Sequence, residues 1–406
     1  MIFQALDDKK ECIGIYTNGK MNFNEIPEGL TQTWSYSPYL AGIPVEYASI
    51  YAEGKSLTDL CPEELKAEWA LRKKKLKAFQ TSFIEAKVSL KDNCYFDLMP
   101  VKFLEEYCET KNKITEHVLK THKRPEEYDF FRRFQELLTD IKFRKLNIDY
   151  TPIKTKLVTD AGVTQFKKIS DKEHIIFDMF GSVTGRLTTA DGSFPIHNFQ
   201  KSYREILKPQ NDWFVVFDVN AAELRTSLAL IGDKQPEGDL YEWIAKEIFE
   251  GTLTRAQTKD VAISWLYNSS NPSGKQHAEQ LNSLFKKEEL RKKYWDGKIV
   301  STPFKRQIEA DEHHSISYLN QSTFIDLFHR QILKADDYLK GKDSFISFML
   351  HDELVLDMTD DEKNEILKIV EILEDTPYGK FLVNVKVGKN YGDLKKLNLK
   401  REKCTQ

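Results

Sequence analysis

Long apolar segments are missing from this chain of 406 residues. No apolar run reaches the roughly 20 residues that a membrane-spanning helix needs. The amino terminus also lacks the charged-then-apolar pattern of a secretory signal. We therefore expect a protein without a membrane segment and with a cytoplasmic location.

Cysteine is scarce and irregularly spaced. The chain has five cysteines, an odd number, and no CxxC pair. They are Cys12, Cys61, Cys94, Cys108 and Cys404. A zinc site and a disulfide framework are therefore poorly supported, and a reducing compartment is the natural location.

An excess of positive charge is missing as well. The formal net charge is −3, whereas proteins that grip nucleic acid are usually basic because Lys and Arg make their phosphate contacts. The distribution is more informative, since the stretch 275–306 is locally basic. Its cations include Lys286, Lys287, Arg291, Lys292, Lys293, Lys298, Lys305 and Arg306. Such a run fits either a nucleic-acid contact or a solvated helix face.

What the chain does have is apolar material for a packed interior. Hydrophobic residues make up 40% of it and aromatic residues 12%. A chain of this length should hold about two or three structural units. Residues 1–60 show short strands and turns, and the pattern becomes helical from Pro62. Apolar spacing predicts helices over 67–79, 104–118 and 130–141, and the last two are predicted to form a helical hairpin.

The rest of the chain alternates between strands and helices. An apolar run at 213–217 ends in Asp218, and strand-like runs flank the pair His351-Asp352. These runs are 344–350 and 353–357. Helices are predicted over 239–249, 254–267, 276–294, 316–339 and 361–374. The layout indicates an α+β fold with its strands gathered around two acidic turns.

Asp218 and Asp352 are the first candidates for chemistry. If their strands share one sheet, the two carboxylates can hold two divalent cations about 3.5–4 Å apart, which stabilise the attacking and leaving oxygens of a phosphoryl transfer. Mg²⁺ suits this arrangement because it takes few protein carboxylates together with waters and substrate phosphates. The alternative is that each Asp is a turn former or a helix cap.

The helix from Thr254 carries a second constellation. Arg255, Lys259, Ile263 and Tyr267 are spaced four residues apart and therefore share one broad helical face. Two cations, an apolar residue and an aromatic ring in a row match the phosphates, sugar and base of a nucleoside triphosphate. The alternative is an exposed cationic edge beside a packed Ile and Tyr.

These segments resemble the motifs of family-A DNA polymerases. Residues 217–225 (FDVNAAELR) are similar to motif A, residues 255–267 to the fingers helix of motif B, and residues 350–353 (LHDE) to motif C. Further segments resemble other motifs of the family. They are 184–187 (TGRL) with Asn198 downstream, 239–245, 297–306, 321–323 and 388–392. Each match is weak alone, but the eight occur in the family's order over more than half of the chain.

The resemblance implies roles in the catalytic centre. Asp218 and Asp352 would bind two Mg²⁺ ions, and Glu353 would support the site. Lys259 would neutralise the triphosphate and protonate the leaving pyrophosphate, while Arg255 would hold the outer phosphates.

It also implies contacts with nucleotide and DNA. Glu223 would crowd the sugar C2′ position and exclude ribonucleotides, and Tyr267 would lie under the templating base with its hydroxyl near Glu223. Ile263 would line the nucleotide site. The implied DNA-binding residues, which contact the primer end or minor-groove acceptors shared by all correct pairs, are Arg186, Asn198, Gln321 and His351.

Some positions depart from the family pattern. Ile263 stands where the family usually has Phe or Tyr, and Asn268 replaces the Gly that usually follows the helix tyrosine. Ser317 stands where an Asn is common, and the stretch 267–297 looks shorter than usual. These differences put substrate affinity and sugar selection in doubt, but not the reaction.

The implied architecture is the right hand of a polymerase, with a palm sheet, helical fingers and a helical thumb. We expect a small β-rich region, an exonuclease remnant or replacement, at 1–60 and a helical linker and thumb at 61–148. The palm is expected at 149–232 and 313–406, with the fingers at 233–312. The implied activity is template-directed extension of a primer 3′-OH with dNTPs by two-Mg²⁺ nucleotidyl transfer, with primer-template DNA and dNTPs as partners.

A proofreading activity is not expected. Residues 1–100 offer Asp7, Asp8 and Glu11 but neither the DxE nor the YxxxD motif of the family's exonuclease. A separate exonuclease or a processivity factor is therefore an expected partner. By analogy, the compact, lysine-rich chain looks more like a bacteriophage replication enzyme than a cellular repair enzyme, which would place it in the host cytoplasm.

Two other interpretations stay open. A single-subunit phage RNA polymerase shares the palm and the fingers Lys and Tyr, but Glu223, the TGRL segment and Glu353 disfavour it. A non-catalytic subunit that binds primer-template DNA is disfavoured by the intact Asp218, Lys259 and Asp352.

Overall fold

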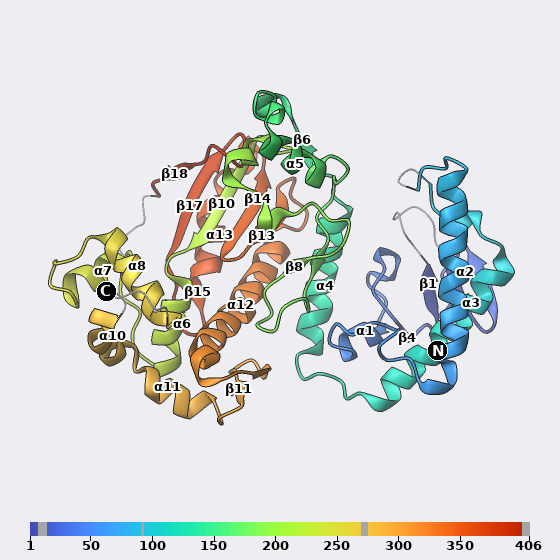
Figure 1. Cartoon of the computed structure of the whole chain (residues 1–406), viewed down its shortest axis with the longest axis horizontal. Helices are drawn as coiled ribbons and strands as arrows, with labels where there is room; N and C mark the ends of the chain where they lie inside the picture. The colour runs from blue at the N-terminus through green and yellow to red at the C-terminus, as the bar shows by residue number, and fades with distance from the viewer. Residues whose placement is uncertain (7–13, 91–92, 269–274, 400–406) are drawn as a thin grey trace. The chain divides into compact units, whose positions relative to one another are not determined.

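The computed structural model describes residues 1–6, 14–90, 93–268 and 275–399. The chain divides into two compact units, Met1–Phe143 and Arg144–Gln406 (Figure 1). The exonuclease candidates Asp7, Asp8 and Glu11 lie outside the described residues.

The first unit joins a small antiparallel sheet to helices. The sheet has the order β1-β2-β3, and β2 and β3 meet at Asn18 and Gly19, whose φ angles of 52° and 80° suit a tight hairpin turn. The strands of this unit are β1 (Gln4–Leu6), β2 (Gly14–Thr17), β3 (Lys20–Phe23), β4 (Gln32–Thr33) and β5 (Glu46–Tyr47). Its helices are α1 (Ala48–Tyr51), α2 (Lys66–Glu85), α3 (Val101–Thr121) and α4 (Tyr128–Phe143). Leu6 and Tyr16 of the sheet pack with Phe103 of α3, so the β-rich region shares a core with the helices that follow it.

The second unit is built on an antiparallel sheet with the order β13-β14-β10-β17-β18. These strands are β10 (Trp213–Val219), β13 (Phe345–Leu350), β14 (Glu353–Met358), β17 (Val383–Gly388) and β18 (Lys395–Leu397). Four consecutive residues of β10, 214–217, are buried, as expected for a central strand. Figure 1 shows β17, β10, β14 and β13 side by side, with α12 and α13 beside them.

Helices accompany this sheet, and most of them share an apolar cluster. They are α5 (Asp160–Ile169), α6 (Ala222–Ile231), α7 (Leu240–Glu247), α8 (Arg255–Leu266), α10 (Ala278–Phe285), α11 (Lys287–Tyr294), α12 (Glu312–Leu339) and α13 (Glu365–Glu374). The cluster joins Leu224 of α6, Ile244 of α7, Trp265 of α8, Phe285 of α10 and Leu319 of α12. Packing against α7 and α10 in this cluster therefore holds α8, which carries the predicted nucleotide-binding face.

Short strands complete the unit. They are β6 (Asn147–Ile148), β7 (Phe177–Asp178), β8 (Thr188–Thr189), β9 (Leu207–Lys208), β11 (Ile299–Ser301), β12 (Gln307–Glu309), β15 (Asp375–Thr376) and β16 (Gly379–Lys380). The mixture of a sheet and packed helices confirms the predicted α+β class.

The structure corrects two of the predicted helices. The segment 276–294 forms two helices, α10 and α11, because Lys286 between them has a left-handed backbone with a φ of 45°. The predicted helix at 361–374 begins later, at Glu365, after a short 3-10 turn at Asp360–Glu362.

Two findings concern the properties that the sequence lacks. Within the described part of the chain, no helix combines the length and the apolar character needed to cross a bilayer. Among the described cysteines, Cys61 and Cys108 are buried free thiols.

Candidate active site

The register of the sheet brings three acidic residues together. Asp218, near the end of β10, pairs with Glu353 at the start of β14 and with Asn384 of β17. Asp352 directly precedes β14, and its carbonyl oxygen accepts a hydrogen bond from the Val219 amide at 3.2 Å. The expected meeting of Asp218 and Asp352 in one sheet therefore occurs, and Glu353 joins them.

A cation lies among these carboxylates. Nζ of Lys386, from β17, donates hydrogen bonds to Oδ2 of Asp218 at 2.8 Å and to Oε1 of Glu353 at 3.2 Å. The hydroxyl of Tyr391 donates to Oε2 of Glu353 at 3.1 Å. Burial alone would lower the pKa of Lys386, but the hydrogen bond to Asp218 and the neighbouring negative charges raise it overall. The side chain is therefore an ammonium at neutral pH.

Asp352 is the carboxylate with the least favourable surroundings. Its pKa is raised from 3.8 to about 6, mainly by burial and next by the negative charge of Asp218. The folded protein thus binds a proton at Asp352 more tightly than the unfolded chain does. A nearby cation would favour the ionised form.

The helix α8 presents its predicted face to the same place. A capping box starts the helix: the Thr254 hydroxyl oxygen accepts from the Gln257 amide at 3.3 Å, and the Gln257 side-chain oxygen accepts from the Thr254 amide at 2.9 Å. A cavity of about 280 Å³ lies between α8 and the end of the sheet. Its lining includes Arg186, Asp218, Glu223, Tyr241, Arg255, Lys259, Ile263, His351, Asp352 and Asn384.

Glu223 is held at the edge of this cavity by two partners. The hydroxyl of Tyr267, at the end of α8, lies 2.7 Å from both carboxylate oxygens of Glu223. Arg186 donates to Oε1 of Glu223 at 2.8 Å. With the amide of Gln321 oriented so that its nitrogen donates to Thr184 at 2.5 Å, its oxygen accepts from Arg186 at 2.7 and 3.2 Å. This network joins the TGRL segment, α6, α8 and α12.

A second network ties Arg255 to the sheet. Arg255 donates to Oδ2 of Asp239 at 2.6 and 3.0 Å, and Asn220 donates to the same oxygen at 2.8 Å. The other oxygen of Asp239 caps the first turn of α7 by accepting from the amides of Tyr241 and Glu242. Burial alone would raise the pKa of Asp239, but these hydrogen bonds and the Arg255 charge hold it below its ordinary value.

The fully buried Arg225 supports this loop. It donates to the backbone carbonyls of Asn220, Pro236 and Gly238 at 2.9, 3.2 and 2.6 Å. The Arg of the motif-A-like segment therefore shapes the loop that carries Asp239 and does not face the cavity.

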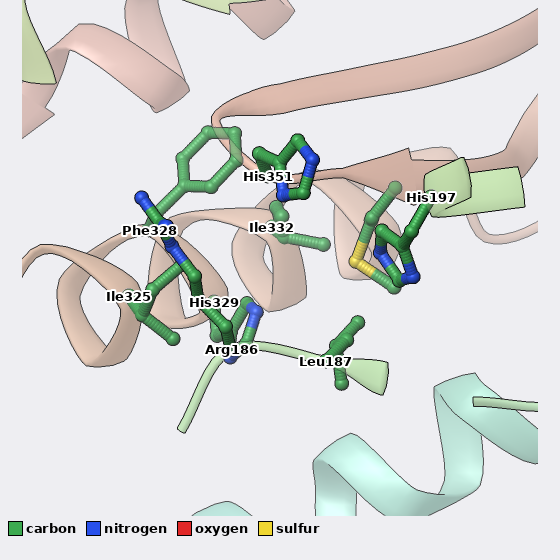
Figure 2. Close-up of a pocket in the computed structure, with 9 residues that line it drawn as sticks. Arg186, Leu187, His197, Ile325, Phe328, His329, Ile332 and His351 are labelled. Atoms are coloured by element: carbon green, nitrogen blue, oxygen red, sulfur yellow. The ribbon is translucent and has the colours of Figure 1, made fainter. Parts of the chain in front are cut away.

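A smaller cavity, shown in Figure 2, lies beside the first. Arg186 and Leu187 enter it from the TGRL segment, and His351 enters from the turn between β13 and β14. His197 lies with its ring centre 5.3 Å from that of His351. The remaining lining comes mainly from α12, with Ile325, Phe328, His329 and Ile332.

The histidines of this cavity are uncharged at neutral pH. Burial lowers the pKa of His197 to about 4 and that of His329 to about 3. Burial and the Arg186 charge also lower the pKa of His351. The cavity is small, about 10 Å³, and is lined by neutral imidazoles beside one guanidinium.

One predicted residue stands apart. Asn198 ends the short helix η6 (Ile196–Asn198), is exposed, and lines neither cavity. Sequence reasoning in turn missed Lys386 and Asn384 on β17, and His197 beside His351. For Lys386 and Asn384 the signal was available, because the alternation of 383–388 marks a strand whose polar residues share one face.

The acidic residues fit divalent metal ions in their chemistry. Carboxylate oxygens are the ligands that Mg²⁺ prefers, and the Lys386 ammonium shows that the place attracts a cation. No group of three or more His, Cys, Asp and Glu side chains in the described ranges is arranged as a ready-made metal cage. Asp218 and Glu353 are instead turned to Lys386.

The antiparallel sheet, its acidic end and the surrounding helices form an α+β fold. The chain is similar in structure to the polymerase domain of Pol1 from M. smegmatis, solved in complex with DNA primer-template and dNTP. The TM-score is 0.55 at 13% identity, covering 72% of this chain and 76% of that one. In sequence, the chain is 24% identical to DNA polymerase I of Aquifex aeolicus (strain VF5) over 65% of its own length. It spans 58% of the length of that relative. No protein-family model matches the chain.

The raised pKa of Asp352 predicts a pH-dependent stability of the metal-free protein. Protonation at Asp352 stabilises the fold fully below about pH 4, and this contribution is lost as the pH rises through about 6. Asp352→Asn removes the buried charge, so we expect it to raise the free energy of unfolding at pH 7 by on the order of 1–3 kcal/mol. At pH 4 the difference should vanish.

Urea unfolding in EDTA at the two pH values measures this effect. The exposed Asp191→Asn is the matched control and should show no pH-dependent difference from wild type. If Asp352→Asn instead lowered the free energy of unfolding at pH 7, the buried charge of Asp352 would not be destabilising.

Proposed function

We propose that the protein is a DNA-directed DNA polymerase of the family-A type. It would extend a primer 3′-OH along a template with dNTPs, by a mechanism that uses two Mg²⁺ ions. The observation that carries the proposal is the cavity of about 280 Å³ between the sheet and α8. Asp218 and Asp352 line it from the sheet side, and Arg255 and Lys259 line it from α8. Carboxylates for metal on one wall and cations for phosphate on the other are what nucleotidyl transfer requires.

The residues on the two walls divide the work. Asp218 and Asp352 would hold the metal ions, and Glu353 would set the position of Asp218 through their shared partner Lys386. The chemistry that two bound Mg²⁺ ions supply is charge stabilisation at the attacking and leaving oxygens. Lys259, which has its Nζ 6.0 Å from the ring centre of Tyr241, would neutralise the triphosphate and donate a proton to the leaving pyrophosphate.

Arg255 has a partner before any nucleotide arrives. Its guanidinium is paired with Asp239, and its side chain is 45% exposed. It can therefore bind an outer phosphate through its free donors or by exchanging Asp239 for the phosphate, and Asp239 keeps Asn220 and two backbone amides as donors. This exchange would bring charge to the nucleotide without leaving a bare carboxylate.

The position of Glu223 favours DNA synthesis over RNA synthesis. Glu223 lines the cavity and is fixed by Tyr267 and Arg186, so its carboxylate is a rigid wall and not a mobile surface group. A fixed carboxylate against the sugar would exclude a 2′-hydroxyl by contact.

The DNA would lie beside Arg186 and His351, which line both cavities. Arg186, Gln321 and His351 would contact the primer-template minor groove, where neutral imidazole and a guanidinium suit acceptors common to every base pair. Asn198 would contact the DNA backbone from the exposed end of η6. The helical part of the first unit would serve as the thumb. The palm would comprise 149–232 and 313–406, and the fingers would comprise 233–312.

Primer extension tests the proposal. Wild-type protein with a labelled primer-template, dNTPs and Mg²⁺ should extend the primer, and EDTA should abolish extension. Asp218→Asn and Asp352→Asn should each reduce the rate by about 10³-fold or more, because each removes a metal ligand. Binding of the primer-template should change little, since duplex affinity comes from many backbone contacts. Extension by either variant at near the wild-type rate would contradict its assignment as a ligand.

The absence of proofreading is part of the same proposal. Purified protein incubated with a mismatched primer end and Mg²⁺, without dNTPs, should leave the primer at full length. Shortening that persists in Asp218→Asn would reveal a nuclease site separate from the polymerase site, and would make a partner exonuclease unnecessary.

Glu223 provides the test of sugar selection. Glu223→Ala should raise the efficiency of ribonucleotide use relative to deoxyribonucleotide use by about tenfold or more, because it opens space for the 2′-hydroxyl. Tyr267→Phe, which removes only the hydroxyl that anchors Glu223, should produce a smaller shift in the same direction. The ratio of kcat/KM values for the two nucleotide types is the measurement. Glu242→Ala, a carboxylate deletion on α7, is the control and should leave the ratio unchanged.

A further inference from the structure

Lys386 holds two of the acidic residues at the same time. Its Nζ lies 2.8 Å from Oδ2 of Asp218 and 3.2 Å from Oε1 of Glu353. The exposed fractions of the Lys386, Asp218 and Glu353 side chains are 34%, 27% and 18%, so these charges are partly shielded from solvent. Such contacts are stronger than those of a surface ion pair.

The sheet register explains why a lysine at this position reaches both. Asp218 and Glu353 are direct cross-strand partners, and like charges in that relation repel. On the other side of β10, Asn384 is the direct partner of Asp218, and Lys386 lies two residues further along the same face. A residue in that diagonal position needs a long side chain to touch Asp218, and lysine supplies both the length and the opposite charge.

We propose that Lys386 is an internal cation that neutralises and positions Asp218 and Glu353 while no metal is bound, and that a divalent ion must displace it from Asp218. The inference rests on the proposed function, because it assigns Asp218 to metal binding. Lys386 is then a positioning residue, since it acts through the carboxylates and not on the nucleotide.

Competition between the ammonium and the metal has two consequences. Without Lys386, the carboxylates of the metal-free protein repel one another with nothing to offset them, so the fold loses stability. The same loss leaves a more negative site, so a divalent ion binds more tightly. A lysine that served only to hold the sheet together would produce the first effect without the second.

The experiment compares Lys386→Met with Lys396→Met. Lys396 is the register partner of Lys386 on β18, so its removal deletes the same charge from the neighbouring strand without a contact to Asp218 or Glu353. Binding of Mn²⁺ alone, with no DNA or nucleotide, is measured by electron paramagnetic resonance. Thermal unfolding is followed with and without Mn²⁺.

We expect Lys386→Met to bind Mn²⁺ roughly tenfold more tightly than wild type, in the range of ordinary coupling between sites. Its Tm in EDTA should fall by about 2–5 °C, and saturating Mn²⁺ should restore it. Lys396→Met and the charge-retaining Lys386→Arg should behave like wild type. In an Asp218→Asn background, Lys386→Met should cost much less stability, because the charge it offsets is gone.

Two results would overturn the inference. One is an affinity for Mn²⁺ that is equal or weaker in Lys386→Met than in Lys396→Met. The other is a loss of Tm that Mn²⁺ does not restore, which is the signature of a purely structural lysine.

Primer extension separates this inference from the proposed function: wild-type extension with unchanged Mn²⁺ affinity in Lys386→Met overturns the inference alone. Tighter Mn²⁺ binding without any extension supports the inference and contradicts the polymerase activity, and no Mn²⁺ binding in any variant contradicts both.

Discussion

The antiparallel pairing of β10 with β14 places Asp218 directly opposite Glu353, and the two negative charges repel each other. Neighbouring side chains offset this repulsion. Lys386 reaches across from β17, and Tyr391 donates to the far oxygen of Glu353. The raised pKa of Asp352 has its second cause in the same crowding, after burial. Folding alone disfavours such a concentration of negative charge, so the site gains from any cation that enters it. The electrostatics of the sheet therefore favour a positive charge at this place, and Lys386 supplies one.

The connection between sheet and helices runs through one carboxylate. Asp239 caps α7, accepts from Asn220 of the segment after β10, and pairs with Arg255 at the start of α8. The buried Arg225 fixes the loop before Asp239 by bonding to its backbone carbonyls. A phosphate that engaged Arg255 would thus act on a carboxylate that also begins α7. Binding of such a phosphate would therefore affect both helices that line the cavity, α7 and α8.

The sequence allowed prediction of the strands and helices with strong apolar patterns, and of the residues at their ends. Asp218 and Asp352 could be placed because the apolar runs before and after them mark buried strands. The alternation of 383–388 marks the strand that carries Lys386, but it does not determine the strand register that places Lys386 beside Asp218. The break between α10 and α11 could not be predicted either. Lys286 adopts a left-handed backbone there, and lysine is not a residue type that indicates this conformation. Local patterns predict elements, whereas pairing and packing between distant segments decide the site.

Asn268, which stands where the resembling family usually has Gly, also has a left-handed backbone. Asn268 has a φ of 50°, a conformation that Gly adopts freely and that Asn tolerates better than most other residues. Unlike Gly, Asn268 also has a side chain, which accepts from Lys287 at 2.6 Å and donates to the carbonyl of His313 at 2.7 Å. These contacts tie the end of α8 to α11 and α12. Tyr267 directly precedes Asn268, so the same contacts keep the Tyr267 hydroxyl within reach of Glu223. Asn268 in place of Gly therefore holds Tyr267, and through it Glu223, in a fixed position at the cavity.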